Sequence, residues 1–472
     1  MIDLKNLTII QAHAGLKAGK FACLELLEAC LAKIEENKKL NIFLEVFSDA
    51  RSQAEEAQKK FAEGTATLMT GIPVALKDNI LFEGHKVSAG SKILENYVAS
   101  YDANAVRKLK EAGAVIMGRT NMDEFAMGVS TENSAYGVTK NPHDEGRVSG
   151  GSSGGSTAAV ATYGAMVALG SDTGGSCRQP ASFCGVVGLK PTYGSVSRSG
   201  LIAMSSSLDV IGPIGKNVSD VEIIFNVIKG EDKMDSTSIP EGLYEKKEIR
   251  KPKIGVPRHL LKEGVDKKVL DNFEDYLRKF QSLGYEVRDI ELPYVGYSVS
   301  AYYIIVPAEI SANLARFDGM RYGTHENGND IINDYFKTRG KRFGREVKRR
   351  ILVGTYVLSA GYQDEYYNKA VAIRELIKKD FKDAFEEVDL ILTPTTTGPA
   401  FKIGEKVNDP VKMYLEDVFT GPANMTGLPA ISIPAGYIQE EGKSLPIGIQ
   451  FIAPHQREDL LFMIGKQFES IR

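Results

Sequence analysis

The amino-acid sequence predicts a mixed α/β fold, in which helices cover a central β-sheet. Two observations support this prediction. Short apolar runs typical of buried strands alternate with stretches of helical periodicity, and 43% of the residues are hydrophobic against 25% that are charged. A chain of 472 residues exceeds the usual size of one simple domain. It therefore has room either for one large α/β domain with insertions or for two domains.

Residues 1–65 are predicted to form a helical segment that packs on the core. Apolar residues recur at helical spacing between positions 24 and 34. The pattern changes after Gly71, where the apolar run IPVAL at 72–76 is typical of a buried strand. We therefore expect the main α/β unit to span residues 66–472.

Capping residues indicate where further elements begin and end. Asp102 can begin a helix that ends at Gly113, and residues 114–117 are predicted to form the strand that follows. Asp266 is expected to begin a helix with a single apolar stripe, which ends at Gly284. Three more strands are predicted, at residues 285–292, 388–392 and 447–451.

The charge balance favours no polyanionic partner. There are 58 Lys and Arg residues against 61 Asp and Glu, a formal net charge of −3, so the chain as a whole is not attracted to nucleic acid or to an anionic membrane. The N-terminus lacks the charged start and the continuous apolar stretch of a signal peptide. The longest run of small and apolar residues, 158–170, is too short to span a bilayer. Residues 229–253 are polar and charged, and we expect a linker or a surface excursion there.

Four cysteines in a chain of this length do not form a disulfide framework. Cys23 and Cys30 are seven residues apart in a predicted helix, and Cys177 and Cys184 lack the spacing of zinc ligands. We expect a reduced, cytoplasmic protein with no metal ion and no cofactor of its own.

The densest cluster of small residues is GGSSGGS at 150–156, which is followed by SDTGGSCRQP at 171–180. Such residues bury no side chain and cost chain entropy, but they let backbone N–H groups approach a ligand. A phosphate cradle is disfavoured because neither G-x-x-x-x-G-K-[ST] nor G-x-G-x-x-G is present. A flexible linker is disfavoured because residues 157–169 are apolar and Ala-rich, as in a buried helix. A nucleophile beside an oxyanion hole fits best, since TGGS at 173–176 places a serine next to closely packed backbone donors.

A serine nucleophile needs a base to take its proton. None of the six histidines lies in a recognisable triad setting, although their spacing leaves a distant histidine open as the base. Lys77, at the end of the first apolar run, is a second candidate. On the sequence alone, a lysine in this position is more often a strand end that reaches water. As a base, Lys77 must be uncharged, so burial must lower its pKa from about 10.4 towards neutrality.

Lys77 and the two serine-rich segments together resemble the amidase signature family, whose members use a Ser–cis-Ser–Lys triad. The resemblance implies that Ser176 is the nucleophile, that Ser152 is the bridging serine after a cis peptide bond, and that Lys77 is the base. The 24-residue separation of the two serines matches the family and favours Ser152 over Ser153. The resemblance also implies one large amidase-signature catalytic domain over residues 66–472, with a mixed central β-sheet covered by helices.

The same resemblance implies that backbone N–H groups around Thr173, Gly174, Gly175 and Ser176 form the oxyanion hole. Cys177 stands where an aliphatic residue is common in the family, and it offers a thiol nucleophile as an alternative. That alternative is disfavoured, because a side chain next to the nucleophile in sequence usually points elsewhere.

Within the family, the chain is most similar to the glutaminase (A) subunits of tRNA-dependent amidotransferases. The similarity extends over residues 5–470 and is carried by the segments 119–127, 130–136, 358–362 and 424–429. It implies hydrolysis of glutamine to ammonia, which a partner B subunit uses to amidate Glu-tRNA(Gln) or Asp-tRNA(Asn), while a small C subunit holds the assembly together. ATP, Mg²⁺ and most of the tRNA contact are expected at the B subunit, and no membrane contact is expected.

Two other functions are weighed against this one. The first is a stand-alone amidase that acts on small aliphatic or aryl amides. The second is a non-catalytic scaffold with a relic site, and the intact Lys77, Ser152 and Ser176 argue against it.

A glutamine site needs groups that bind an α-carboxylate and an α-ammonium. The resemblance assigns Arg350 to the first and Asp417 to the second, as their charges allow. Without the resemblance, an exposed arginine and a helix-surface aspartate are the better interpretations. The run 337–350 holds eight Lys or Arg and one Glu, and a solvated helix face is favoured over an RNA-facing patch. Asp123 and Glu124 suggest a carboxylate pair, but adjacent residues rarely converge on one substrate.

Overall fold

The computed structural model describes residues 2–240, 242–243, 248 and 251–472. Part of the predicted linker at 229–253 therefore lies outside the described residues. The strands are β1 (Phe43–Val46), β2 (Pro73–Lys77), β3 (Val115–Thr120), β4 (Lys140–Asn141), β5 (Asp144–Val148), β6 (Val167–Asp172), β7 (Val187–Lys190), β8 (Val210–Gly215), β9 (Ile254–Val256), β10 (Val287–Asp289), β11 (Leu390–Pro394), β12 (Ala430–Glu440) and β13 (Lys443–Ile452). The helices are α1 (Ile9–Lys17), α2 (Cys23–Glu36), α3 (Ala50–Ala62), α4 (Asn104–Glu111), α5 (Gly154–Ala161), α6 (Arg178–Cys184), α7 (Val218–Ile228), α8 (Lys267–Ser282), α9 (Ser298–Asn313), α10 (Ile331–Arg342), α11 (Arg345–Val357), α12 (Lys369–Glu387), α13 (Pro410–Tyr414), α14 (Gly421–Thr426) and α15 (Glu458–Ile471).

Within the described part of the chain, eleven strands form one mixed sheet in the order β1-β3-β2-β6-β8-β7-β12-β13-β11-β9-β10. Strands β3, β2 and β6 are parallel, as are β11, β9 and β10, and the other neighbours pair antiparallel. Strands β4 and β5 form a separate two-stranded sheet. The mixed α/β fold predicted from the sequence is confirmed.

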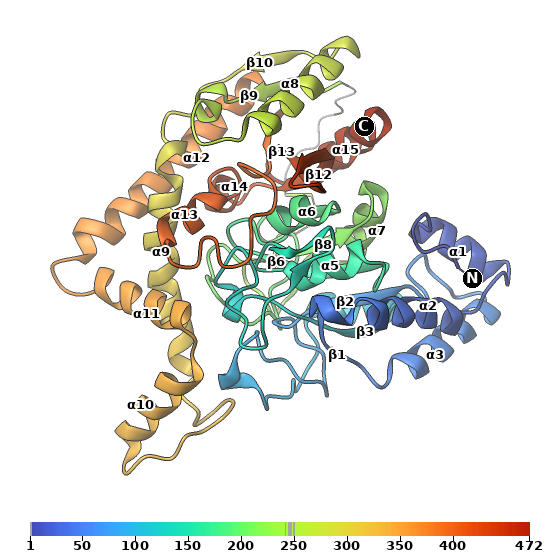
Figure 1. Cartoon of the computed structure of the whole chain (residues 1–472), viewed down its shortest axis with the longest axis horizontal. Helices are drawn as coiled ribbons and strands as arrows, with labels where there is room; N and C mark the ends of the chain where they lie inside the picture. Colours follow the sequence, from blue (N-terminus) through green and yellow to red (C-terminus); the bar gives the residue numbers. More distant parts are fainter. Residues whose placement is uncertain (1, 241, 244–247, 249–250) are drawn as a thin grey trace.

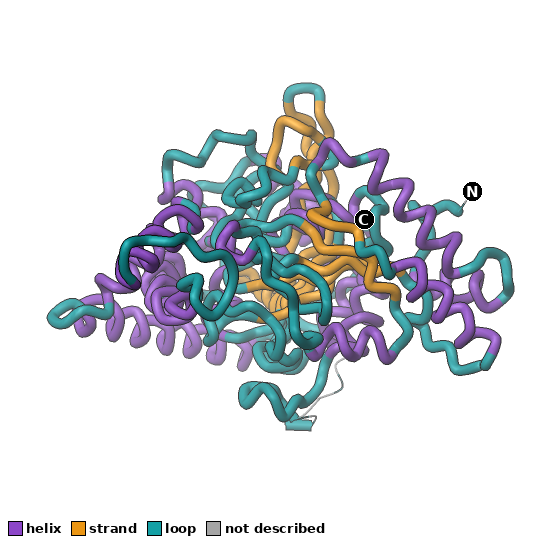
Figure 2. The backbone as a smooth tube through the Cα atoms, turned by 90° about the horizontal axis from the view of Figure 1, so that it is seen from below, coloured by secondary structure: helices purple, strands orange, loops and turns teal. Residues whose placement is uncertain are grey.

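Helices lie on either side of the sheet, as Figure 2 shows from below. In Figure 1, α1 to α3 lie at the end of the molecule next to β1, β2 and β3, while α9 to α12 form an arm along the opposite side. Strands β2 and β6 are buried along their whole length, which explains why the first strand is continuously apolar in the sequence. Over the residues that the structure covers, no helix combines the length and apolar character needed to cross a bilayer.

The N-terminal segment contains a strand that the helical prediction omitted. Strand β1 lies between α2 and α3 and pairs antiparallel with β3 at the edge of the sheet. Leu26, Leu27 and Cys30 of α2 are fully buried in the same apolar cluster as residues of β2 and β6. The segment therefore packs on the core as expected, and the domain boundary at residue 65 stays a prediction.

Two of the predicted helices differ in their capping. Asp266 precedes α8, and its side chain accepts the Lys268 N–H at 2.7 Å, as predicted. The cap assigned to Asp102 is wrong, because α4 follows Ala103 and the Asp102 carboxylate instead accepts the N–H of Glu83.

The long apolar segment at 157–169 was predicted to be one buried helix, but it divides into the end of α5 and the start of β6. The chain turns at Tyr163, which has a positive φ of 61°. An apolar, Ala-rich composition suits a buried helix and a buried strand equally, so composition alone could not reveal the division.

The topology places the serine-rich segments at one edge of the sheet. Strands β2 and β6 are parallel neighbours, with Leu76 paired to Leu169, so their carboxyl ends emerge together. Lys77 is the last residue of β2 and Asp172 the last residue of β6. Ligands of open α/β sheets bind outside these carboxyl ends. The candidate active site is therefore expected there.

Candidate active site

Lys77 is fully buried and surrounded by hydroxyl groups. Its Nζ lies 2.7 Å from Ser152 Oγ, 2.8 Å from Ser153 Oγ and 2.9 Å from Ser171 Oγ. The interpretation of Lys77 as a strand end that reaches water is therefore wrong. Burial lowers the pKa of Lys77 to about 8, because the ammonium loses hydration that neutral hydroxyls replace only in part. The uncharged fraction of Lys77 therefore rises as the pH passes through about 8.

Ser152 follows a cis peptide bond from Gly151, as the family resemblance implied. Gly151 is confined by its neighbours, since a Cβ there would lie 2.1 Å from Asp123 Oδ2 and 2.6 Å from the Ser130 nitrogen. Only glycine fits between these atoms. The same turn approaches the second serine-rich segment, because the N–H of Ser153 donates to the Ser176 carbonyl oxygen at 3.1 Å.

Ser176 lies in the loop between β6 and α6, and 7% of its surface is exposed. The carboxylate of Asp172 shapes this loop by accepting the N–H of Gly175 at 2.9 Å and that of Cys177 at 3.1 Å. Asp172 is itself buried against Arg178, with Oδ1 and Nη2 3.0 Å apart. Burial by itself raises the pKa of Asp172, but the charge of Arg178 and its hydrogen bonds outweigh burial and keep this pKa at about 2. The loop that carries Ser176 is thus held by a permanent carboxylate.

The predicted oxyanion hole needs one correction. The N–H of Gly175 already donates to Asp172, so this group is not available to a substrate oxygen in the arrangement seen here. The backbone N–H groups of Thr173, Gly174 and Ser176 have no acceptor among the described residues. Thr173 and Gly174 therefore stay predicted donors, and the N–H of Ser176 stays with them.

Arg350 and Asp417 are buried. The interpretations based on the sequence without the resemblance, an exposed arginine and a helix-surface aspartate, are therefore wrong. Arg350 Nε donates to Glu346 Oε1 at 2.8 Å, and its guanidinium lies over the rings of Tyr303 and Tyr414, 5.1 Å and 5.7 Å from their centroids. Asp417 accepts the hydroxyl of Tyr303 at 2.9 Å. Burial raises the pKa of Asp417 to about 7. Tyr303 therefore connects the two predicted substrate-binding groups.

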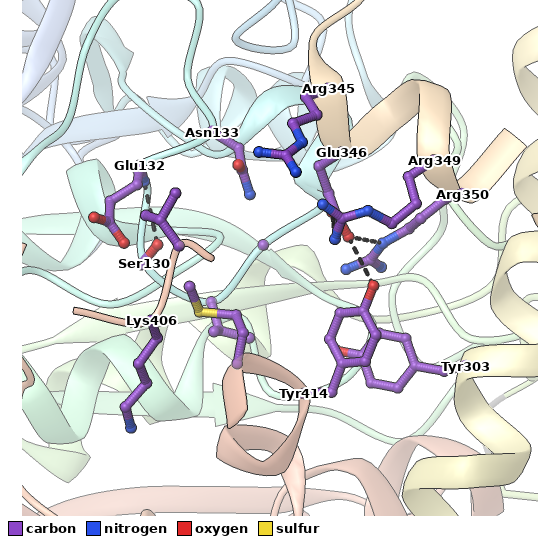
Figure 3. A pocket seen from close by; sticks show the side chains of 14 residues that line it. Ser130, Glu132, Asn133, Tyr303, Arg345, Glu346, Arg349, Arg350, Lys406 and Tyr414 are labelled. Carbon is purple, nitrogen blue, oxygen red and sulfur yellow. Dashed lines mark hydrogen bonds and ion pairs between the residues drawn. The ribbon is translucent and has the colours of Figure 1, made fainter. Parts of the chain in front are cut away.

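A pocket opens beside Arg350, between α11, the loop at 128–133 and the segment 406–414 (Figure 3). Figure 3 shows Arg345, Arg349 and Arg350 on one wall and Glu132 on the other. A pocket that presents both charge signs suits a zwitterion better than a neutral amide.

The pocket wall reaches the serine turn through Gln179. The Nε2 of Gln179 donates to the Val129 carbonyl at 3.0 Å, and its Oε1 accepts the Gly151 N–H at 3.0 Å. Val129 lines the pocket and Gly151 forms the cis peptide bond. One buried side chain thus joins the pocket to the turn that holds Ser152.

The thiol alternative is not supported at Cys177. Its side chain is fully buried, with Sγ 4.0 Å from Ser153 Oγ and 3.7 Å from the Gly212 carbonyl oxygen. Burial raises the pKa of Cys177 to about 12, so the thiolate that would attack a carbonyl is scarce at neutral pH.

Asp123 and Glu124 do not form a carboxylate pair. Asp123 accepts backbone N–H groups of Thr131 and Asn133, whereas Glu124 accepts the N–H of Gly344 at 2.8 Å. The expected divergence of adjacent side chains is observed.

Across the described residues no group of three or more His, Cys, Asp and Glu is placed to hold a metal ion.

The basic run at 337–350 extends over the end of α10 and the start of α11. Glu326 pairs with Lys341 at 3.2 Å and also with Arg342. The run contains the buried Arg350, which lines the pocket, as well as an exposed face. The exposed members are Lys337, Lys341, Arg345 and Lys348, which is the solvated face favoured from the sequence.

Sequence reasoning missed Ser171 and Tyr303. Ser171 stands inside a quoted motif, and its place at the end of a strand parallel to β2 was the signal that could have identified it as a Lys77 partner. Tyr303 lies in the middle of α9, far from either serine-rich segment, and no motif distinguishes it.

Comparison with known proteins agrees with this geometry. The sequence model of the amidase family matches residues 25–462. The chain belongs to the amidase family. The cis peptide bond at Ser152 and the burial of Lys77 thus occur in an amidase, while the roles of the individual residues stay predictions.

Amidase relatives cover nearly the whole chain. The A subunit of glutamyl-tRNA(Gln) amidotransferase from Thermoanaerobacter pseudethanolicus is 50% identical over 477 aligned residues, which cover 99% of this chain and 97% of the relative. The crystal structure of the corresponding A subunit from Thermotoga maritima superposes with a TM-score of 0.79 at 40% identity, and covers 98% of this chain and 94% of the other. The peptide amidase from Stenotrophomonas maltophilia superposes with a TM-score of 0.80 at 28% identity, over 99% of this chain and 97% of the other. The similarity in sequence is thus higher to the amidotransferase subunits than to the peptide amidase.

Proposed function

We propose that this amidase is the glutamine-hydrolysing A subunit of a tRNA-dependent amidotransferase. One observation carries the proposal: a buried lysine with a lowered pKa lies next to Ser152, and the pocket that Gln179 joins to the serine turn is lined by a buried arginine and by Tyr303, whose hydroxyl donates to a buried aspartate. The 50% identity to the A subunit of a glutamyl-tRNA(Gln) amidotransferase, over almost the full length, supports it.

In the proposed reaction, uncharged Lys77 takes the proton of Ser152, while Ser152 takes that of Ser176. The freed Oγ of Ser176 attacks the carboxamide carbon of glutamine and forms a tetrahedral intermediate. The N–H groups of Thr173, Gly174 and Ser176 stabilise its oxyanion. The C–N bond then breaks, and the proton returns through Ser152 to the leaving nitrogen, so that ammonia departs.

The acyl-enzyme on Ser176 is a glutamyl ester, which water hydrolyses by the same relay. Lys77 accepts the proton of the attacking water through Ser152, the ester C–O bond breaks to give glutamate, and the proton returns through Ser152 to the departing Oγ of Ser176. Both halves of the cycle need Lys77 to alternate between its neutral and charged forms. The pKa of about 8 allows this alternation.

Substrate selection is assigned to Arg350, which lines the pocket, and to Asp417, which accepts the hydroxyl of the lining residue Tyr303. Arg350 offers its remaining N–H groups to the α-carboxylate, because Nε already donates to Glu346. Asp417 pairs with the α-ammonium. Because burial deprives the Asp417 carboxylate of water, an ion pair with the ammonium is strengthened there. The two tyrosines under the guanidinium keep its plane fixed.

Two partner proteins are proposed for this chain. They are a B subunit, which uses the ammonia to amidate Glu-tRNA(Gln) or Asp-tRNA(Asn), and a small C subunit. ATP and Mg²⁺ are proposed to bind at the B subunit, which also makes most of the tRNA contact. This chain is proposed to need no metal ion or cofactor of its own.

The alternative is a stand-alone amidase for small aliphatic or aryl amides, and the likeness to a peptide amidase favours it. Purification of the chain from its native extract separates the two functions. Two co-purifying subunits and ammonia release from glutamine support the amidotransferase. A lone active oligomer that hydrolyses benzamide or propionamide faster than glutamine would contradict it.

A further inference from the structure

The loop at 122–133 lies between the pocket and the serine turn. The N–H of Asp123 donates to the Ser152 carbonyl oxygen at 3.3 Å, and the Thr131 hydroxyl donates to the Gly150 carbonyl oxygen at 2.7 Å. On its other side the loop lines the pocket with Gly128, Val129 and Ser130. The loop thus contacts both parts of the candidate site.

Three residues other than glycine hold a positive φ in this loop. They are Phe125 at 48°, Ala126 at 62° and Thr131 at 63°. Such conformations persist only where surrounding contacts enforce them, and they are frequent near functional sites. The contacts here come from Asp123, whose buried carboxylate accepts the N–H groups of Thr131 and Asn133.

Glu124 contacts other parts of the chain than Asp123 does. Its buried carboxylate accepts the Ser91 hydroxyl and, at 2.8 Å, the N–H of Gly344. Gly344 is the N-cap residue of α11, the helix that carries Arg350. The approach is close, since a Cβ on Gly344 would lie 2.2 Å from Glu124 Oε2. The carboxylate therefore fixes the start of α11 against the loop.

We propose that Glu124 is a positioning residue that sets the separation between Arg350 and the serine turn. The connection runs from Arg350 along the first turns of α11 to Gly344, across one hydrogen bond to Glu124, and through the adjacent Asp123 to Ser152. A substrate anchored by its α-carboxylate then has its carboxamide placed at Ser176. This inference rests on the proposed glutaminase function, since it needs a substrate that Arg350 anchors.

The test compares an anchored substrate with one that is not anchored. The enzyme, together with its co-purified subunits, is assayed with glutamine and with p-nitrophenyl acetate, which has no α-carboxylate or α-ammonium. In Glu124→Ala the ratio of the glutamine kcat/KM to the ester kcat/KM is expected to fall about tenfold or more, because a small displacement of a bound substrate costs rate steeply. An equal loss for both substrates, or no loss, would overturn the proposal.

Two further variants separate positioning from a general loss of stability. Glu124→Gln can still accept the Gly344 N–H and can donate to the Ser91 hydroxyl, so it is expected to restore the ratio. Burial raises the pKa of Glu124 to about 7, which makes the uncharged amide a close mimic. The matched control is Asp220→Ala, which removes a buried carboxylate of α7 that accepts the Ile9 N–H at 2.9 Å at the start of α1. It is expected to lower thermal stability without changing the substrate ratio.

A measurement that is independent of substrate keeps the inference distinct from the proposed function. Hydrogen exchange of the segments 343–350 and 150–153 is followed in the wild type, Glu124→Ala and Asp220→Ala. Faster exchange in both segments is expected only in Glu124→Ala. If the wild type hydrolyses the ester but not glutamine, the proposed function fails, while this exchange pattern still decides whether Glu124 connects the two segments. Unchanged exchange would overturn the connection.

Discussion

The proposed proton-relay region and the proposed substrate pocket of this amidase differ in their chemistry and in the origin of their residues. Around Lys77 the contacts are neutral hydroxyls from two short segments, at distances of 2.7 to 2.9 Å. Around Arg350 the contacts are a carboxylate one turn away on α11 and two aromatic rings from distant parts of the chain, α9 and α13. The surroundings of Lys77 disfavour the positive charge of its ammonium, whereas the surroundings of Arg350 favour the positive charge of its guanidinium.

This difference follows from what each region has to do. A lysine base needs surroundings that destabilise its ammonium, and burial among hydroxyls achieves this without a directly paired carboxylate. A carboxylate-binding arginine needs a permanent charge and a fixed plane, which Glu346, Tyr303 and Tyr414 provide. Changes in the two regions should therefore affect different kinetic constants.

The largest effect is expected in the relay. Ser176→Ala removes the atom that forms the covalent bond, and glutamine hydrolysis should fall about 10⁴-fold or more. Thermal unfolding should change little, because Ser176 lies in a loop and makes its hydrogen bond to Ser153 through its backbone. A variant that keeps substantial glutaminase activity would exclude Ser176 as the nucleophile.

The next effect is expected in the pocket and in KM rather than in folding. Arg350→Ala should raise the KM for glutamine about 100-fold, since a buried charge-assisted contact to the substrate is lost. Arg350→Lys tests whether the planar fork is needed, because it keeps the charge. Arg349→Ala is a graded comparison on the same pocket wall: Arg349 pairs with the same Glu346 at 2.7 Å but is more exposed, so this variant should raise the KM less than Arg350→Ala does. Equal KM values for all three variants and the wild type would remove Arg350 from the site.

The two regions should also separate in their pH dependence. Below about pH 8 the Lys77 amine is increasingly charged and cannot accept a proton, so kcat should rise with pH up to about 8 and then level. Below about pH 7 Asp417 is increasingly protonated and loses its attraction for an ammonium, so KM should rise as the pH falls. Steady-state kinetics from about pH 6 to about pH 9 measure both. A kcat that is greatest at acid pH would contradict the lysine base.

The smallest effect is expected at Cys177. Cys177→Ala should leave kcat/KM within about threefold, because the buried thiol is protonated at neutral pH and contributes only packing. The same assay with an alkylating reagent serves as a control, since a buried thiol should react slowly. A loss of kcat/KM comparable to that of Ser176→Ala would instead support Cys177 as the nucleophile.

Much of the relay could be predicted from the sequence, because its members lie in short segments with a recognisable spacing. Lys77 ends an apolar run, and Ser152 and Ser176 stand in glycine-rich motifs. The pocket was accessible only through family resemblance. Arg350 belongs to a basic run, which on its own indicates a solvated face, and no local pattern predicts that this one arginine is buried.

Local patterns were enough to predict the fold class and the buried strand that ends at Lys77, whereas the family resemblance predicted that the two serine-rich segments meet Lys77. The predictions from local patterns depend on periodicity and on small residues, which are properties of neighbouring positions in the chain. Three features emerged only from the folded chain: the Gly175 N–H is taken by Asp172, Tyr303 connects Arg350 with Asp417, and Glu124 contacts the start of α11. Such contacts join residues from different elements, and burial, which sets the pKa of Lys77 and of Asp417, exists only once those elements have packed.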